Sequence, residues 1–297
     1  MSDTADHTTG YLLGHSELEH RRLLVQASYV RPWTTRLLRR AGLTEGMSVL
    51  DIGSGLGDVA FIAAEIVGPG GRVIGVERDP AAVDVARRRS TSGGYTDIVT
   101  FANVDLAEFD PAESGGTRPF DALVGRFVLQ YLPDPAAALR RLAGFVRPGG
   151  IVVMHDMDAS NPGVSFPRCQ LWNDCYALLG ALFRAHGIAP DFGRHLTRVF
   201  LDAGLPWPDV TSGAMTGGKP GSTVFTWLGS AVQAVEPLLL QAGVALPEGV
   251  AIDGSLPATL ERAVQESRSM VLGNTHYGAW THLGHMALHE AANAAQP

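Results

Sequence analysis

The chain has 297 residues, 23 of them basic and 30 acidic, which gives a formal net charge of −7 at pH 7. That length suits one α/β domain of about 200 residues with additional helices packed on it. Because the balance is acidic, we expect no general attraction to nucleic acid or to an anionic membrane surface. Residues 1–10 are polar and lack an apolar signal core, and we find no uninterrupted apolar run long enough to span a bilayer. A cytoplasmic protein is therefore predicted.

The first 42 residues are predicted to form a helical lid. The sequence from Ser16 to Glu19 fits an S-x-x-E capping box, in which two polar side chains bind free backbone N–H groups at the start of a helix. Pro32 predicts the start of a second helix that ends near Gly42, because proline is favoured in the first turn of a helix.

Residues 43–158 alternate between short apolar strands and amphipathic helices, which is the pattern of a doubly wound, mostly parallel α/β sheet. The proline and glycines of Arg147 to Gly150 predict a turn before the last strand of this segment. The predicted strands are Ser48 to Ile52, Val73 to Val76, Val99 to Val104, Ala122 to Gly125 and Ile151 to Met154.

Residues 159–297 are predicted to cover the core and to complete it. Aromatic residues recur at helical spacing within residues 159–190, which indicates an inserted cap helix. The C-terminal part, residues 191–297, is predicted to contain a strand near Asp209 to Met215, a second inserted helix (Val224 to Ala242) within residues 222–270, and a final antiparallel strand from Asn274 to Thr281.

The segment from Asp51 to Asp58 joins a buried strand to a helix and is the most specific motif of the chain. Gly53, Ser54 and Gly55 form its turn, where glycine lets the backbone approach a ligand that faces the free N–H groups of the next helix. A dinucleotide-binding loop has the spacing G-x-G-x-x-G, whereas here Asp58 stands at the position of the third glycine. The loop predicts a nucleotide-type cofactor but departs from the pattern for NAD.

Acidic residues end the next two predicted strands. Glu77 lies about twenty residues beyond the glycine loop, where a carboxylate can accept both hydroxyl groups of a ribose, and Arg78 follows it in the predicted cofactor site. Asp105 is expected to bind an adenine amino group while Leu106 covers the ring. The alternatives are a solvated Glu77 and an Asp105 that only caps the next helix.

The loop, the strand-end acids and the stretch Phe120 to Asp134 together resemble the class I S-adenosylmethionine-dependent methyltransferases over about residues 45–158. The resemblance implies a Rossmann-like fold with a seven-stranded sheet and S-adenosylmethionine as cofactor. Asp51 belongs to the same pattern and is assigned to the cofactor site.

The segment from Tyr11 to Gln26 resembles the leader of bacterial small-molecule members of this family. The resemblance implies that Tyr11 and Gln26 contact the methionine end of the cofactor, with Arg126 beneath. The alternative is a helix that only packs on the sheet.

A protein contributes to methyl transfer mainly by aligning the acceptor and excluding water, because the reaction is an in-line displacement. An acceptor O–H, N–H or C–H also loses a proton, and His276, His155 and Tyr131 are the predicted candidates for its base, with Asp156 and Asp158 as further ones. A purely structural role is the alternative for each. No metal site is predicted, because no carboxylate or cysteine completes a ligand motif near the histidines at positions 282, 285 and 289.

Aromatic residues of the inserted helices and the final strand are predicted to line an apolar substrate pocket. They are Trp172, Tyr176, Phe183, Phe225, Trp227 and Tyr277. At helical spacing such a stripe also suits ordinary core or an oligomer interface, so a homo-oligomer is compatible with the sequence.

The sequence therefore predicts a methyltransferase of secondary metabolism that acts on a small aromatic or indole-like molecule, at carbon, nitrogen or oxygen. The alternatives are an NAD-dependent oxidoreductase and a non-catalytic cofactor-binding protein of the same fold. Substrate identity, acceptor atom, stereochemistry and subunit number stay open.

Overall fold

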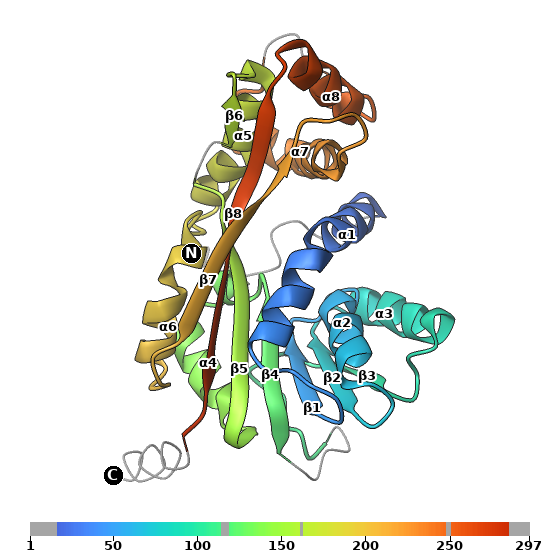
Figure 1. The fold of residues 1–297 in the computed structure, drawn as a ribbon, viewed down its shortest axis with the longest axis vertical. Helices are drawn as coiled ribbons and strands as arrows, with labels where there is room; N and C mark the ends of the chain where they lie inside the picture. The colour runs from blue at the N-terminus through green and yellow to red at the C-terminus, as the bar shows by residue number, and fades with distance from the viewer. Residues whose placement is uncertain (1–16, 114–118, 161–162, 248–250, 285–297) are drawn as a thin grey trace, which may run out of the picture.

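The computed structural model of the chain describes residues 17–113, 119–160, 163–247 and 251–284 (Figure 1). These residues form one sheet of eight strands in the order β3-β2-β1-β4-β5-β8-β6, with β7 paired to β8. The strands are β1 (Ser48–Ile52), β2 (Arg72–Glu77), β3 (Val99–Asn103), β4 (Phe120–Arg126), β5 (Val146–Asp158), β6 (Val164–Phe166), β7 (Asp209–Gly217) and β8 (Met270–His282).

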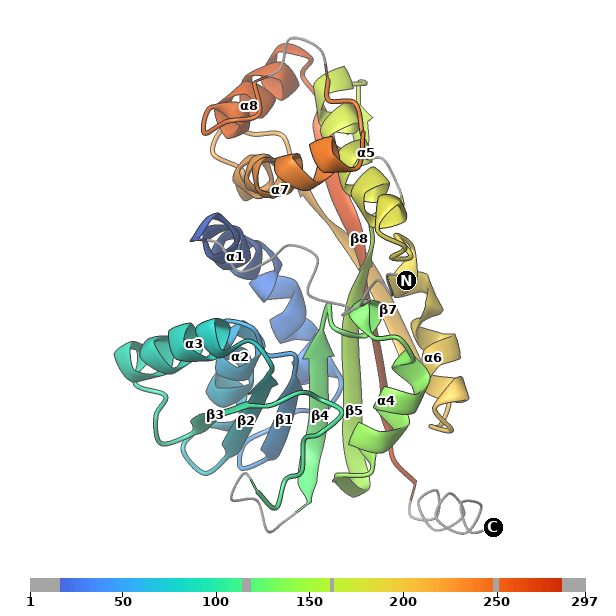
Figure 2. The same ribbon diagram turned by 180° about the vertical axis from the view of Figure 1, so that it is seen from behind.

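Helices cover both faces of the sheet, as Figures 1 and 2 show from opposite sides. The α-helices are α1 (Glu17–Arg40), α2 (Asp58–Val67), α3 (Pro80–Gly93), α4 (Pro135–Ala143), α5 (Gln170–Ala185), α6 (Leu196–Asp202), α7 (Thr223–Gln241) and α8 (Leu256–Glu266). The structure also contains two short 3-10 helices, η1 (Leu129–Tyr131) between β4 and α4, and η2 (Phe192–His195) between α5 and α6.

The core strands are apolar because both faces of the sheet are covered. Strands β1 to β5 run parallel to one another in the order given above. Side chains that alternate along each strand enter two hydrophobic clusters, one under α1 to α3 and one under α4 and α6. The parallel strands therefore end at a single edge, where ligands bind in folds of this kind.

The antiparallel strands β7 and β8 extend beyond this core and carry a helical cap. One edge of β8 pairs with β5 and then with β6, while its other edge pairs with β7. Helices α5, α7 and α8 pack together on the extension, and the N-terminal half of α1 joins their hydrophobic cluster. Figure 1 shows α1 between this cap and the core.

Helix α7 is long and apolar enough to cross a membrane by length and composition, as no other helix among the described ranges is. Half of its apolar stretch is buried within the protein, against α1, α5 and α8. The helix was predicted from sequence at Val224 to Ala242, and Gln233 and Glu236 interrupt its apolar run.

The predicted fold class is confirmed, and the strands predicted from sequence lie where the structure has them. The two predicted N-terminal helices are one helix, α1, which contains Pro32. A proline inside a helix costs about 3 kcal/mol or more, and the burial of Val30, Trp33 and Leu37 on both sides of it offsets that cost. Ser16 and Tyr11 lie outside the described residues.

Two further differences concern the sheet. The predicted turn at 147–150 is a bulge inside β5, because the pairing with β4 moves from Val146 opposite Phe120 to Ile151 opposite Ala122. The sheet also contains the short strand β6, and the second inserted segment holds two helices, α7 and α8, where the sequence predicted one.

Candidate functional site

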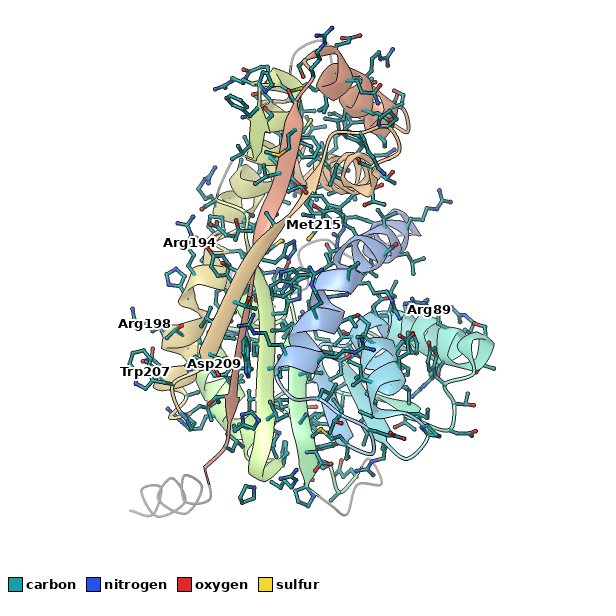
Figure 3. The ribbon with its side chains drawn as sticks, in the orientation of Figure 1. Arg89, Arg194, Arg198, Trp207, Asp209 and Met215 are labelled. Atoms are coloured by element: carbon teal, nitrogen blue, oxygen red, sulfur yellow. The ribbon has the colours of Figure 1, made fainter. Side chains whose placement is uncertain are left out.

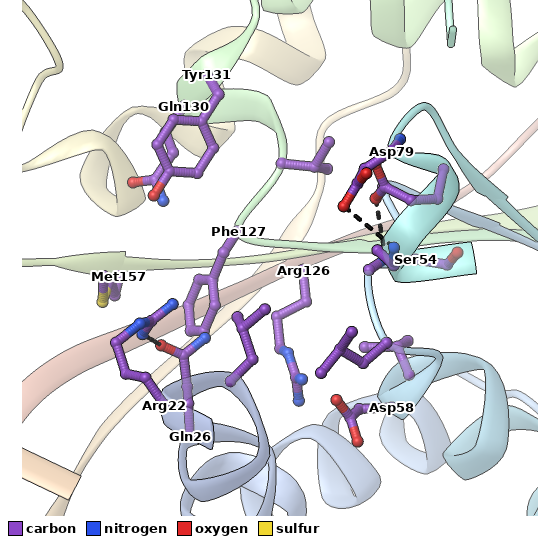
Figure 4. Close-up of a pocket in the computed structure, with 18 of the residues that line it drawn as sticks. Arg22, Gln26, Ser54, Asp58, Asp79, Arg126, Phe127, Gln130, Tyr131 and Met157 are labelled. Carbon is purple, nitrogen blue, oxygen red and sulfur yellow. Dashed lines mark hydrogen bonds between the residues drawn. The ribbon is translucent and has the colours of Figure 1, made fainter. Parts of the chain in front are cut away.

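A pocket lies at the carboxyl edge of the parallel strands, between the core and the cap (Figure 4). Its polar side is built from the β1–α2 loop and from the ends of β2 and β4, with α1 closing one flank. Its apolar side comes from α5 and α7 of the cap. One cavity thus touches both the region predicted to bind a cofactor and the region predicted to bind a substrate.

The glycine loop forms the floor of the pocket, and its backbone conformation requires glycine at two positions. Gly53 has φ +60, and a Cβ there would lie 2.6 Å from Val128 Cγ2, so a side chain has neither a relaxed backbone nor space. Gly55 has φ +52 with nothing within 4 Å of its Cβ position, so its backbone is open to the pocket. Ser54 also lines the cavity, and its buried hydroxyl has no hydrogen-bond partner among the described residues.

Glu77 stands at the end of β2 and holds the polar wall together. Its Oε2 accepts a hydrogen bond from Gly55 N–H at 3.0 Å, and its Oε1 accepts one from Asp79 N–H at 3.0 Å. Because a carboxylate oxygen has a second lone pair, both oxygens can still accept a hydroxyl group from the pocket. This geometry fits a ribose diol.

Arg78, Asp105 and Leu106 also line the pocket, at the ends of β2 and β3. Asp105 is exposed, and its Oδ1 accepts a hydrogen bond from Ala107 N–H at 2.8 Å in a local turn. No α-helix follows it before β4 in the described segment, so the helix-capping alternative does not apply. The neighbouring apolar Leu106 is suited to cover a planar ring.

The opposite end of the polar side is basic. Arg126 ends β4, and its Nη1 donates to Thr34 Oγ1 at 3.2 Å. Gln26 of α1 lies next to it on the pocket wall, where its Oε1 accepts a hydrogen bond from Arg22 Nη1 at 2.6 Å. Figure 4 shows this pair and Arg126 on the same side of the cavity. Guanidinium and amide donors fit a carboxylate such as that of a methionine group.

Asp51 lies beneath the loop rather than on the pocket surface. Its side chain is buried, neither carboxylate oxygen has a hydrogen-bond partner among the described residues, and it does not line the cavity. Burial raises the pKa of this carboxyl group to about 8, although the nearby charge of Arg126 lowers it. Asp51 was predicted to belong to the cofactor site. A bound ligand could contact its carboxylate only through a group that extends below the β1–α2 loop.

The structure corrects the placement of two of the three predicted bases. His155 and His276 are buried and do not line the pocket. The ring of Phe127, which lines the pocket, lies 4.9 Å from the His155 ring and 5.8 Å from the His276 ring. His155 Nε2 lies 3.1 Å from His276 Nδ1, and burial lowers the pKa of His276 to about 3. Such a weakly basic, covered histidine is poorly suited to accept a proton from an acceptor.

Tyr131 does line the pocket, on η1 beside Gln130 (Figure 4). The region Asp156 to Asp158 lies at the end of β5 behind this wall. Burial raises the pKa of Asp156 to about 8, while Asp158 pairs with Arg194 outside the cavity. Neither aspartate lines the pocket.

Most of the aromatic residues predicted for the substrate pocket belong to the cap core instead. Of the six, Phe183 and Trp227 line the cavity, as predicted. Trp172 and Tyr176 share a face of α5 with the pocket residues Leu179 and Phe183, but they lie up to three turns further from it. Their rings meet α7 and β8, where Trp172 Nε1 donates to Leu272 O at 3.2 Å.

Phe225 and Tyr277 are displaced from the pocket for related reasons. Phe225 packs edge to face on Trp172, at a ring distance of 6.0 Å, inside the cap. Tyr277 alternates along β8 with His276 and so faces the opposite side of the sheet, against the cluster under α4 and α6.

Sequence reasoning missed several pocket residues. They are Arg22, Phe127, Gln130, Met157, Leu179 and Leu182. Met157 lies within the observed β5, three residues beyond the predicted strand, so a longer strand prediction would have included it, whereas Phe127 is the first residue after the observed β4. The leucines carry no chemical signal, because only the packing of α5 shows which face of the helix meets the cavity.

Comparison with known proteins identifies the protein family to which this fold and pocket correspond. Residues 43–187 match the family model described as a methyltransferase domain. That segment belongs to the S-adenosylmethionine-dependent methyltransferases, so the predicted family and cofactor are confirmed. The oxidoreductase alternative is thereby set aside.

The curated relatives share part of the chain. An uncharacterized 37.1 kDa protein in transposon TN4556 of Streptomyces fradiae is 30% identical over 65% of this chain and 53% of its own length. The ubiquinone/menaquinone biosynthesis C-methyltransferase UbiE of Hahella chejuensis is 33% identical over 46% of this chain and 53% of its own. Aklanonic acid methyltransferase DauC of a Streptomyces species is 36% identical over 41% and 53%. The chain thus spans about half the length of these relatives.

Two solved structures share the fold. The YcgJ protein of Bacillus subtilis has a TM-score of 0.51 at 15% identity, over 84% of this chain and 97% of its own. Phosphoethanolamine N-methyltransferase 2 of Haemonchus contortus has a TM-score of 0.50 at 19% identity, over 85% of this chain and 52% of its own. At these identities the likeness shows the architecture.

Proposed function

We propose that this chain transfers a methyl group from S-adenosylmethionine to a small, aromatic or indole-like acceptor, leaving S-adenosylhomocysteine. The observation that carries the proposal is the continuity of the pocket. A wall with Glu77, Asp105 and Arg126 faces an apolar wall with Leu182 and Trp227 across one cavity. The named activities of the relatives, on quinone precursors and aklanonic acid, are consistent with such an acceptor.

The residues present fit the cofactor. Glu77 would hold the ribose hydroxyls, Asp105 and Leu106 the adenine, and Gln26 with Arg126 the methionine carboxylate. When bound, S-adenosylmethionine supplies a methyl group on a positively charged sulfur. The task of the cap is then to exclude water and to hold the acceptor atom in line with that methyl group.

Proton removal is assigned to the pocket residue Tyr131. It is the one member of the predicted set of bases that lines the cavity. We assign it to hold the acceptor atom by a hydrogen bond and, in its phenolate form, to take the acceptor proton as the new bond forms, which returns it to the neutral phenol and requires direct contact with the acceptor. His155 and His276 retain a structural role in this assignment.

Two measurements test the proposal. Calorimetric titration should show micromolar or tighter binding of S-adenosylhomocysteine and none of NAD; the reverse result would overturn the cofactor assignment. Transfer of labelled methyl from S-adenosylmethionine should then be detected with a panel of hydroxylated naphthalenes, quinols and indoles. Cofactor binding with no transfer to any of them would favour the non-catalytic alternative. The variant Tyr131→Phe should lower kcat and leave cofactor affinity unchanged.

A further inference from the structure

A cluster of buried polar groups lies directly behind the apolar side of the pocket. It comprises the hydroxyl groups of Tyr29 and Tyr176, Trp227 Nε1, Asn274 Oδ1 and His276 Nε2. All five atoms are buried and have no hydrogen-bond partner of normal geometry among the described residues. An unpaired buried polar group costs about 1–3 kcal/mol, so five of them in one region call for a ligand or for bound water.

The five groups come from four elements that pack against one another. Tyr29 comes from α1, Tyr176 from α5, Trp227 from α7 and the other two from β8. A Cβ at Gly273 would lie 2.4 Å from the Tyr29 hydroxyl and 2.7 Å from that of Tyr176, so both phenols point at this stretch of β8. The Trp227 ring stacks on Tyr29 at 5.0 Å.

A bulge in β8 aims this part of the strand at the cluster. The pairing with β7 moves from Thr275 opposite Ala214 to Leu272 opposite Thr216, so Gly273 and Asn274 together face one residue of β7. Bulges of this kind redirect side chains and are enriched beside binding sites. The bulge therefore accounts for a polar asparagine where a buried strand normally carries an apolar residue.

The boundary between cluster and pocket consists of side chains. Trp227, Met157 and Phe127 line the pocket. Asn274 Nδ2 contacts Met157 Sδ at 3.3 Å, and the Phe127 ring lies 5.8 Å from the His276 ring. Phe127 also has φ +57, a left-handed conformation that non-glycine residues seldom adopt outside functional sites. These three side chains therefore separate the cluster from the pocket.

We propose that this cluster is a deep polar subsite of the pocket, which binds an uncharged hydrogen-bonding group of the acceptor, such as a hydroxyl or a carbonyl. The subsite rests on the proposed methyl transfer, since it selects the acceptor for that reaction. It supplies donors from Trp227 and the two phenols and acceptors from Asn274 and His276.

The preference for an uncharged group follows from the charge of the cluster. Burial raises the pKa values of Tyr29 and Tyr176 above the ordinary range and lowers that of His276 to about 3, so all three are neutral at pH 7. The two phenols alter each other's pKa, and the backbone N–H of Asn274 lowers that of Tyr176, yet none of these contacts has normal hydrogen-bond geometry. The charge of Arg126 also lowers the pKa of His276, so a cation would meet a like charge at that end of the cluster. Any charged group would in addition lose its hydration among these neutral side chains, at a large desolvation cost.

The test compares the binding of 2-naphthol and naphthalene to the full chain saturated with S-adenosylhomocysteine. The unmodified protein should bind 2-naphthol at least tenfold more tightly, and the double variant Tyr29→Phe/Tyr176→Phe should reduce this ratio below threefold without weakening naphthalene. The matched control is Tyr95→Phe. The Tyr95 hydroxyl donates to Glu65 Oε1 at 2.8 Å and does not line the pocket, so this variant should keep the full ratio.

Each outcome bears on one proposal. The subsite proposal would be overturned if the double variant kept the full ratio of 2-naphthol to naphthalene affinity. If the double variant does not fold, the same ratio in both single variants decides. Equal binding of both probes by the unmodified protein would also overturn the subsite proposal. A gain in thermal stability with an unchanged ratio would identify the cluster as closed core. The affinity for S-adenosylhomocysteine reports separately on the proposed function and should be the same in all variants.

Discussion

Replacing Asp156 by asparagine should make the protein more stable at neutral pH. The carboxyl group is buried at the end of β5, where Oδ1 accepts a hydrogen bond from Met157 N–H at 3.0 Å. Burial raises its pKa from 3.8 to about 8. An asparagine keeps the accepting oxygen and carries no charge at any pH, so Asp156→Asn changes the titration while it conserves the contact.

The sign and size follow from linkage between protonation and folding. Between pH 4 and pH 8 the unfolded chain releases the Asp156 proton while the folded protein retains it, so stability is full below about pH 4 and falls as pH rises. By pH 7 the free energy of unfolding has fallen over ~3 pH units at about 1.4 kcal/mol each, a loss of roughly 4 kcal/mol. The free energy of unfolding of the variant should equal that of the original protein near pH 4 and exceed it by up to that amount at pH 7.

Urea unfolding at a series of pH values between 4 and 8 measures this difference directly. The exposed Asp97 provides the control, because Asp97→Asn changes the same charge at the surface and should show no comparable trend. If the free energy difference between Asp156→Asn and the original protein stays constant across the series, the carboxyl group is not held neutral by burial and the reasoning is refuted.

Three further predictions concern the pocket and the cap. Glu77→Ala should weaken S-adenosylhomocysteine at least tenfold in calorimetry, a loss of about 1.4 kcal/mol or more; an unchanged affinity would remove Glu77 from the cofactor site. Gly53→Ala should lower the free energy of unfolding by roughly 1–3 kcal/mol, because its Cβ would lie 2.6 Å from Val128, and adding Val128→Ala should restore part of it. Trp172→Ala should cost about 3–5 kcal/mol of stability with little change in KM, whereas Trp227→Ala should chiefly raise the KM of the acceptor; the opposite pattern would contradict the assignment of these two residues to core and pocket.

The sequence by itself determined the core and the cofactor side of the pocket. Strand β1 has the predicted bounds, because Val49, Leu50 and Ile52 give it the run of buried apolar side chains typical of a strand covered on both faces. Glu77 was found from its position at a strand end, since parallel strands bring all such positions to one edge, whereas Arg126 was assigned through the family resemblance. These conclusions depend on local patterns, which the chain carries in neighbouring residues.

Only the tertiary structure decided which residues of the cap meet the pocket. Trp172 and Leu182 both lie on the apolar side of α5, and only the packing of α5 on α7 and β8 separates core from pocket wall. His276 likewise has the chemistry of a base, but Phe127 and Trp33 cover it, and both come from distant parts of the chain. Periodicity tells which face of an element is buried, whereas the partner that buries it is set by contacts between segments far apart in sequence.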